Sequence, residues 1–211
     1  MNIVFDGEGE KHDYYVDGVK KPCISDVIQG LSLSDFGAVP KHHLMEGRER
    51  GKKAHTICEY FDTDNLVMDS VDEALLGYTK AWIMFCKDYS PKWNSIEMKM
   101  YSPIMDICGT LDREGEIKSA ETVVDIKTSE MNAPAHKIQT ATYEHMYTCM
   151  TKVKIKQRWV VKLSADGKYK IEEHKDKSDF NFAMAAVMTY RWKVANKMDK
   201  DIIYNKELYN F

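Results

Sequence analysis

Two aspartates and a lysine near the middle of the chain are the residues whose types and spacing point most directly to chemistry. Asp112 follows the run Cys108-Gly-Thr-Leu, and Asp125-Ile126-Lys127 comes thirteen residues later. Because side chains two apart on a strand share a face, the Asp125 carboxylate and the Lys127 ammonium are expected to project together. If the strands that carry the two aspartates pair as a hairpin, their carboxylates lie side by side and repel unless a cation separates them. Oxygen ligation with open water positions suits Mg²⁺ or Mn²⁺.

Three short strands are expected to position these residues. Apolar runs at Ile104–Leu111 and Thr122–Ile126 predict two of them, joined by a polar turn around Glu114–Ala120. Alternating apolar and polar residues predict a third strand at Ser95–Tyr101. Glu97 on this strand is a candidate for a supporting acid beside the metal, and it ranks after the two aspartates.

Two helices are expected to bring further polar side chains to the sheet. The helix Gly47–Phe61 carries His55, and a helix over 133–150 carries Gln139 and Tyr143. Gln139 and Tyr143 are four residues apart, so they lie on one helix face. Taken alone, each pattern also fits an ordinary amphipathic helix.

Together these elements resemble the PD-(D/E)XK nuclease superfamily. The resemblance rests on Asp112, Asp125-Ile-Lys127 and Gln139-x-x-x-Tyr143 in that order. The last element and the Gly109-Thr-Leu-Asp112 lead-in are similar to the RecB-type branch, which includes many phage exonucleases. Upstream, Arg50-Gly51-x-x-x-His55 resembles the helical His motif of that branch. Asp-x-Lys alone arises often by chance, whereas the four elements in this order, over about residues 48 to 147, are a specific signal.

The resemblance implies a metal-dependent nuclease that needs no covalent enzyme intermediate. It implies Mg²⁺ or Mn²⁺ as the cofactor, held by His55, Asp112, Asp125 and the backbone carbonyl of Ile126. The residues that it assigns to catalysis are Asp112, Asp125, Lys127, Gln139 and Tyr143.

Basic residues cluster just before His55 and next to Asp112. Each of them alone fits a solvated helix surface, but the group directly before His55 fits a phosphate-binding rim equally well. The predicted substrate-binding residues are Arg48, Arg50, Lys52, Lys53 and Arg113.

Length and composition favour one globular domain. The chain has 211 residues, of which 44% are hydrophobic and 30% charged, enough for one sizeable core. We therefore expect a single α/β domain over 1–211, with a central mixed sheet flanked by helices and a catalytic core at about 48–150. The net charge of −3 means that DNA contacts have to come from local basic patches.

The cysteines and the N-terminus bear on cofactor and compartment. Five cysteines form no C-x-x-C pair, and none follows Cys149. Some RecB-type nucleases hold an iron–sulfur cluster through cysteines near the C-terminus, so no such cluster is expected here. The N-terminus lacks the pattern of a signal peptide, and no apolar run approaches the ~20 residues that span a membrane. The expected location is the cytoplasm of a bacterium or of a phage-infected host.

The resulting functional hypothesis is an exonuclease that acts on DNA ends in phage-type recombination or DNA processing. A structure-selective endonuclease and a non-catalytic DNA- or partner-binding protein on a nuclease fold stay open as alternatives. The expected partner is DNA, as duplex ends or a single strand. A phage recombination or single-strand-annealing protein and further copies of the chain are additional candidate partners.

Five further elements are predicted along the chain. Asp17-Gly18 between β-forming residues predicts a hairpin. Helices are expected at Val27–Leu31, at Ser70–Asp88 and at Asp179–Met198, the last with Phe182, Ala186, Met188 and Trp192 in the core. A strand over 152–162 has a basic face, formed by Lys152, Lys154, Lys156, Arg158 and Lys162, of the kind usually found on a solvated edge.

Overall fold

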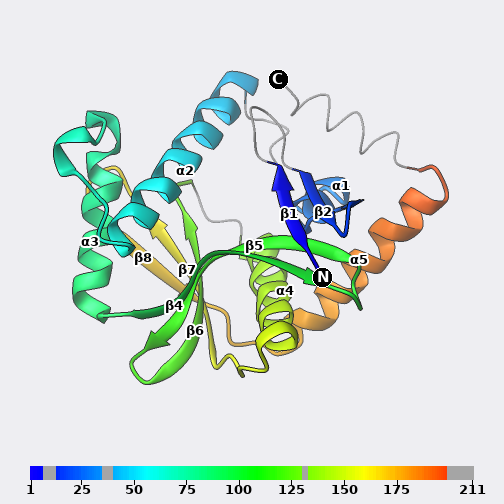
Figure 1. The fold of residues 1–211 in the computed structure, drawn as a ribbon. Helices are drawn as coiled ribbons and strands as arrows, with labels where there is room; N and C mark the ends of the chain where they lie inside the picture. The colour runs from blue at the N-terminus through cyan, green and yellow to red at the C-terminus, as the bar shows by residue number, and fades with distance from the viewer. Residues whose placement is uncertain (7–12, 35–39, 130–132, 199–211) are drawn as a thin grey trace.

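A five-stranded mixed sheet lies at the centre of the protein in a computed structural model that describes residues 1–6, 13–34, 40–129 and 133–198 (Figure 1). The strand order is β4-β5-β6-β7-β8, and only the β6–β7 pair is parallel. The helix α4 (Ala133–Thr151) joins that parallel pair, which requires such a crossover. The strands are β4 (Lys92–Ser102), β5 (Ile107–Ile117), β6 (Ala120–Lys127), β7 (Gln157–Leu163) and β8 (Tyr169–Glu173).

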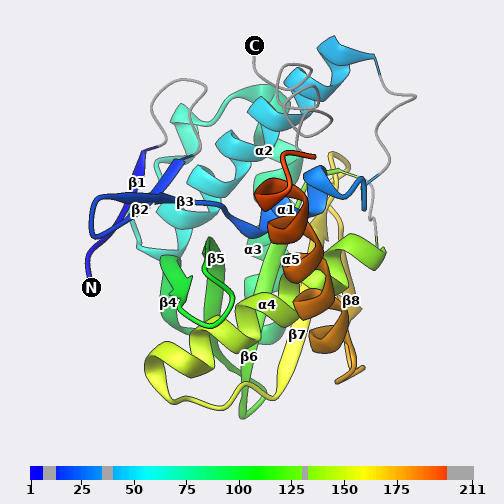
Figure 2. The ribbon, with the colours of Figure 1, turned by 90° about the vertical axis from the view of Figure 1, so that its right-hand side faces the viewer.

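Helices cover both faces of this sheet (Figures 1 and 2). On one face lie α2 (Lys41–Asp62) and α3 (Leu76–Tyr89), and on the other lie α1 (Ile24–Gly30), α4 and α5 (Asp179–Ala195). A hydrophobic core lies on each face of the sheet, and adjacent residues of β6 contribute to different cores. Val123 packs on the α4 side, and Val124 packs with Trp82 and Phe85 of α3. This is the two-residue period of a strand that is buried on both faces. The predicted fold class, a mixed sheet flanked by helices, is confirmed.

A small antiparallel sheet at the N-terminus lies beside β4 and β5 (Figure 2). It consists of β1 (Ile3–Asp6), β2 (Asp13–Val16) and β3 (Val19–Lys21). Asp17 and Gly18 form the predicted hairpin turn, with φ values of 48° and 81° that suit these two residues. The Tyr14 hydroxyl lies 2.8 Å from Thr110 Oγ1, which ties this sheet to β5.

The hairpin between β5 and β6 is longer and tighter than the polar residues predict. β5 continues to Ile117, and the chain turns at Lys118 and Ser119, both with positive φ. The predicted turn at Glu114–Ala120 is therefore wrong over most of its length. Glu114, which its charge places in a turn, is fully buried within β5. Asn94 of β4 and Tyr147 of α4 are among its neighbours, and a local pattern cannot show them.

Four helices have boundaries that differ from the predicted ones. α2 begins at Lys41, six residues before the predicted Gly47, and ends at Asp62. α1 begins at Ile24 because Cys23 is its N-cap and the Asp26 carboxylate accepts the Cys23 N–H at 2.9 Å. α3 begins only at Leu76, because the preceding residues form two 3₁₀ turns, η1 (Met68–Ser70) and η2 (Glu73–Leu75). The last helix ends at Ala195, short of the predicted Met198.

The prediction of the buried face of α5 is mostly wrong. Ala186 is buried, but Phe182, Met188 and Trp192 are 62%, 64% and 58% exposed. The apolar residues of this helix occur on all its faces, so their spacing alone does not select the buried one. The face that packs inward instead carries Ala183, Ala186, Val187 and Tyr190.

The predicted basic strand is also shorter and differently placed. β7 begins only at Gln157 and lies between β6 and β8, so it is not an edge. Arg158 is 2% exposed, and its guanidinium pairs with Asp179 at 2.9 Å and with Glu144 at 3.2 Å.

None of the helices in the described ranges combines the length and apolar character needed to cross a bilayer.

Candidate metal centre

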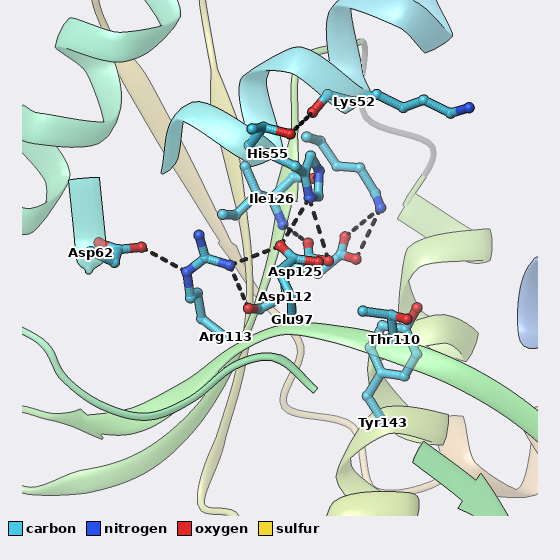
Figure 3. A network of polar contacts seen from close by, with 12 residues as sticks. Lys52, His55, Asp62, Glu97, Thr110, Asp112, Arg113, Asp125, Ile126 and Tyr143 are labelled. Atoms are coloured by element: carbon cyan, nitrogen blue, oxygen red, sulfur yellow. Dashed lines mark hydrogen bonds and ion pairs between the residues drawn. The ribbon is translucent and has the colours of Figure 1, made fainter. Parts of the chain in front are cut away.

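The two aspartates predicted to meet across a hairpin do so. Arg113 of β5 pairs with Val124 of β6, so the preceding residue Asp112 lies opposite Asp125. The Ile126 backbone N–H donates to Asp112 Oδ2 at 2.6 Å (Figure 3). Asp112 is 7% exposed and Asp125 only 1%. Two carboxylates are thus brought together in a largely buried environment.

Lys127 occupies the face of β6 that its spacing predicts. Its Nζ lies 2.9 Å from Asp125 Oδ1 and 2.8 Å from Oδ2. Burial opposes the ammonium charge, but Asp125 and Asp112 raise the pKa of Lys127 above its usual value. Lys127 therefore stays protonated and is a fixed cation beside the acids.

His55 reaches the same place from α2. Its Nε2 donates to the carbonyl oxygen of Ile126 at 3.0 Å, and its Nδ1 lies 3.6 Å from both Asp112 Oδ1 and Glu97 Oε1. Although burial would lower the pKa of His55, the Asp112 and Glu97 carboxylates raise it to about 9. His55 thus lies at the acidic cluster, and the Ile126 carbonyl, the other non-aspartate group predicted to bind metal, contacts the second nitrogen of its ring.

Glu97 is more central than its sequence context indicates. It lies on β4 between Ile96 and Met98, which pair with Arg113 and Leu111, so it is opposite Asp112. Its φ is +48°, in a region that residues other than glycine seldom occupy. Such backbone strain persists only where surrounding contacts impose it. The signal available in the sequence was an acid on a predicted strand, and nothing local indicated its backbone conformation.

One group of side chains within the described residues has the geometry to hold a metal ion. Its members are His55, Glu97 and Asp112, whose ligand atoms all lie within 4.8 Å of one another. This set differs from the predicted set, because Glu97 joins it and the Asp125 carboxylate pairs with Lys127 instead. Two carboxylates and one imidazole suit Mn²⁺, or Mg²⁺ with water completing the octahedron.

The charges around this group also fit a divalent ion. Burial and repulsion from Asp125 and Glu97 raise the pKa of Asp112 to about 6. The connected network contains the carboxylates of Asp62, Glu97, Asp112 and Asp125 and the permanent cations Arg113 and Lys127. With His55 protonated, as its raised pKa implies, the network carries one net negative charge. A divalent ion that binds the neutral imidazole would release that proton and would balance the two negative charges that remain.

A cavity of about 470 Å³ opens onto these residues. Its charged wall includes His55, Glu97, Asp112 and Lys127, while Phe5 and Tyr14 of the N-terminal sheet line another part. A cavity of this size accommodates a small molecule or one unit of a polymer. Its combination of charged and aromatic walls suits a ligand with both an anionic and an apolar part.

Gln139 and Tyr143 lie together along α4, as their spacing predicts, and both line the cavity. Gln139 Nε2 donates to the Tyr143 hydroxyl at 3.0 Å. Burial and the two aspartates raise the pKa of Tyr143, so the phenol stays neutral. The Tyr143 ring packs so closely on β5 that a Cβ at Gly109 would lie 2.8 Å from its Cε1. A Cβ at position 109 would therefore push the Tyr143 ring away from β5.

The predicted basic rim is mostly directed elsewhere. Of its four members on α2, all within the described residues, only Lys52 lines the cavity. Lys53 pairs with Glu49 at 2.9 Å, and the Arg50 guanidinium lies 5.8 Å from the centre of the Tyr78 ring. Arg48 does not reach the cavity wall either.

The prediction that Arg113 binds substrate is wrong. Its side chain is fully buried, with Nε 2.6 Å from Asp62 Oδ2 and Nη1 2.9 Å from Glu97 Oε1 (Figure 3). A position next to Asp112 suggested access to the same ligand. Two acids on neighbouring elements draw the guanidinium inward instead, and a single-strand pattern cannot reveal them.

Comparisons with known proteins give a resemblance in fold alone. The sequence matches no protein-family model and no curated protein. An alkaline exonuclease from Laribacter hongkongensis has a TM-score of 0.41 and 13% identity, with 89% of this chain and 92% of that one covered. The same enzyme in complex with dAMP has a TM-score of 0.39 and 14% identity, with 89% and 92% covered. The protein SSO0001 has a TM-score of 0.39 and 13% identity, with 80% and 74% covered. Similarity at this level says nothing about chemistry, which has to be inferred from the site.

Proposed function

We propose that the chain is a metal-dependent deoxyribonuclease of the PD-(D/E)XK type, with its catalytic core at about 48–150 of a domain over 1–211. The observation that carries this proposal is the group His55, Glu97 and Asp112, with ligand atoms within 4.8 Å, beside the Asp125–Lys127 pair. Acids, an imidazole and a fixed ammonium on one cavity wall are the groups that phosphodiester hydrolysis requires.

The metal ligands in this proposal are His55, Glu97 and Asp112, and the Asp125 carboxylate and the Ile126 carbonyl are further candidates. A divalent ion held there would lower the pKa of a bound water and would neutralise charge on the scissile phosphate. The Ile126 N–H holds one oxygen of Asp112, which leaves Oδ1 on the side of His55. The ligand group is therefore arranged before any ion binds.

Lys127 has the position and charge to act on the phosphate. It lines the cavity, and its ammonium is held by Asp125. A fixed cation in a partly buried site stabilises negative charge that develops in the transition state, and it also orients the attacking water. Gln139 and Tyr143 also line the cavity and would position the substrate strand or that water.

The substrate that we propose is DNA with a free end, as in phage-type recombination or DNA processing. The cavity admits one unit of a polymer, with Lys52 and Lys127 available to phosphate oxygens and Phe5 to an apolar part. The presence of aromatic and charged side chains in one lining favours an unpaired strand, whose bases are accessible. A single-strand-annealing or recombination protein and further copies of this chain stay predicted partners.

The test is incubation of end-labelled linear duplex and covalently closed circular DNA, each with Mg²⁺, with Mn²⁺ or with a chelator. We expect metal-dependent degradation of the linear duplex from its ends, while the circles survive. Asp112→Asn, purified in the same way, controls for a contaminating nuclease. Nicking of the circles at a comparable rate would favour the endonuclease alternative. DNA binding without cleavage under any metal would favour the non-catalytic one.

A further inference from the structure

Arg113 is the one basic residue of the described network that touches the metal centre without touching the cavity. Its guanidinium donates through Nη1 to Glu97 Oε1 at 2.9 Å and to the Asp112 carbonyl at 2.6 Å. Through Nε it donates to Asp62 Oδ2 at 2.6 Å. The side chain is fully buried, and its guanidinium lies 5.8 Å from the centre of the Trp82 ring.

Asp62 gives this guanidinium a rigid anchor. Its side chain is 2% exposed, and its second oxygen, Oδ1, accepts the Trp82 indole N–H at 3.1 Å. Asp62 is the last residue of α2, the helix that also carries His55. The two residues are seven apart, two helical turns, and therefore share a helix face. A contact that fixes Asp62 against the sheet also fixes where His55 meets it.

We propose that Arg113 is the positioning residue of the metal centre, which sets Glu97 and His55 at the spacing that a divalent ion needs. This inference rests on the proposed metal-dependent function. One arm of the guanidinium holds the Glu97 carboxylate on a strained backbone, and the other holds the end of α2 (Figure 3). The planar fork of arginine makes both contacts at once, which a lysine ammonium cannot reproduce.

The chain offers a matched control for this role. Arg158 is likewise buried and bridges two acids, Glu144 and Asp179, and it also donates to the Asp176 carbonyl at 2.6 Å. Glu144 lies on α4, Asp179 begins α5 and Asp176 precedes it. None of the three belongs to the metal-binding group. Loss of either arginine fork disturbs a buried ion network, but only Arg113 belongs to the network of the metal centre.

The experiment measures Mn²⁺ affinity by calorimetry and thermal stability by circular dichroism for Arg113→Lys and Arg158→Lys. We expect both variants to have a lower melting temperature than the wild type. Arg113→Lys should bind Mn²⁺ at least tenfold more weakly, whereas Arg158→Lys should bind it within twofold of the wild type. The Mn²⁺ electron paramagnetic resonance spectrum should change for Arg113→Lys alone, because its ligand geometry changes.

Asp62→Asn provides a second variant if Arg113→Lys does not fold. It keeps the contact with Glu97 but weakens the anchor on α2, so we expect a severalfold loss of Mn²⁺ affinity. The positioning role would be overturned if folded Arg113→Lys had wild-type Mn²⁺ affinity and spectrum. If Arg113→Lys is not obtained in folded form, the same result for folded Asp62→Asn would overturn it. A wild-type protein that binds no Mn²⁺ would instead overturn the metal site and the proposed function with it.

Discussion

The backbone N–H of Ile126 donates to Asp112 Oδ2 over 2.6 Å and thereby fixes the carboxylate across the β5–β6 hairpin. The carbonyl of the same residue accepts from His55 at 3.0 Å. One peptide segment of β6 thus orients a carboxylate of β5 and an imidazole of α2. Because the ligand groups are held before an ion binds, little ordering entropy remains to be lost on binding.

Removal of ligand oxygens should separate the members of the metal centre from ordinary acids. Asp112→Asn and Glu97→Gln each remove one carboxylate charge from the group and should weaken Mn²⁺ binding at least tenfold, with near-complete loss of DNA cleavage. Calorimetry with Mn²⁺ and a gel assay measure the two effects. Asp166→Asn, an exposed acid paired with Lys168, is the control and should change neither. Wild-type Mn²⁺ affinity in the Asp112→Asn/Glu97→Gln double variant would remove both residues from the site.

The neighbouring lysines Lys52 and Lys53 provide a direct test of which basic side chains contact DNA. Lys52 lines the cavity, whereas Lys53 pairs with Glu49 on the helix surface. Lys52→Ala should therefore weaken DNA binding and reduce the slope of log affinity against log salt by about one. Lys53→Ala should leave the slope unchanged. Fluorescence anisotropy over a range of salt concentrations measures both, and equal slopes for the two variants would contradict the assignment.

The strand period predicted the part of the site that depends on local geometry. It placed Lys127 beside Asp125 and, through the hairpin, Asp112 opposite them, as observed. It could not show that Glu97 joins His55 and Asp112, because this depends on the β4–β5 register and on a φ of +48° that no neighbouring residue signals. It also could not orient Arg113, whose burial depends on Asp62, which lies 51 positions away in the sequence.

Long-range packing also decided the elements that differ most from prediction. Charged residues around Glu114 indicated a turn, but the strand continues through it, and the Glu114 side chain is buried near Asn94 of β4 and Tyr147 of α4. On α5, apolar residues on several faces left the buried one undetermined, and packing against α1 and α4 selected the face with Val187. A pattern of residue types carries neither kind of information.

His136 should make the stability of the protein depend on pH. It is 8% exposed in the first turn of α4, and its Nδ1 has no hydrogen-bond partner among the described residues. Burial, and the charge of Lys127, lower the pKa of His136 to about 4. The unfolded chain, with a histidine pKa near 6.5, thus binds more protons between these two values. The stability that His136 contributes is therefore present above about pH 6.5 and is lost as the pH falls toward 4.

The variant His136→Gln isolates this contribution from other titrating groups. The difference in unfolding free energy between wild type and variant should grow by about 3 kcal/mol from pH 4 to pH 7, at roughly 1.4 kcal/mol per pKa unit, and stay constant above. Urea titrations at a series of pH values measure it. A difference that is constant from pH 4 to 7 would show that His136 titrates normally in the folded protein.

Lys127 should act in the chemical step while contributing little to metal binding. Its ammonium pairs with Asp125 and lines the cavity, but it is a cation and cannot itself be a ligand. Lys127→Ala removes the charge that would stabilise the transition state, so the cleavage rate should fall about 100-fold or more. Mn²⁺ affinity should persist or rise, because one positive charge leaves the acidic cluster.

Single-turnover cleavage and calorimetry measure the cleavage rate and the Mn²⁺ affinity separately, and Lys99→Ala, at an exposed position of β4, is the control. A Lys127→Ala protein that cleaves at the wild-type rate would exclude the residue from the mechanism, and one that loses Mn²⁺ together with activity would assign it a structural role at the metal centre.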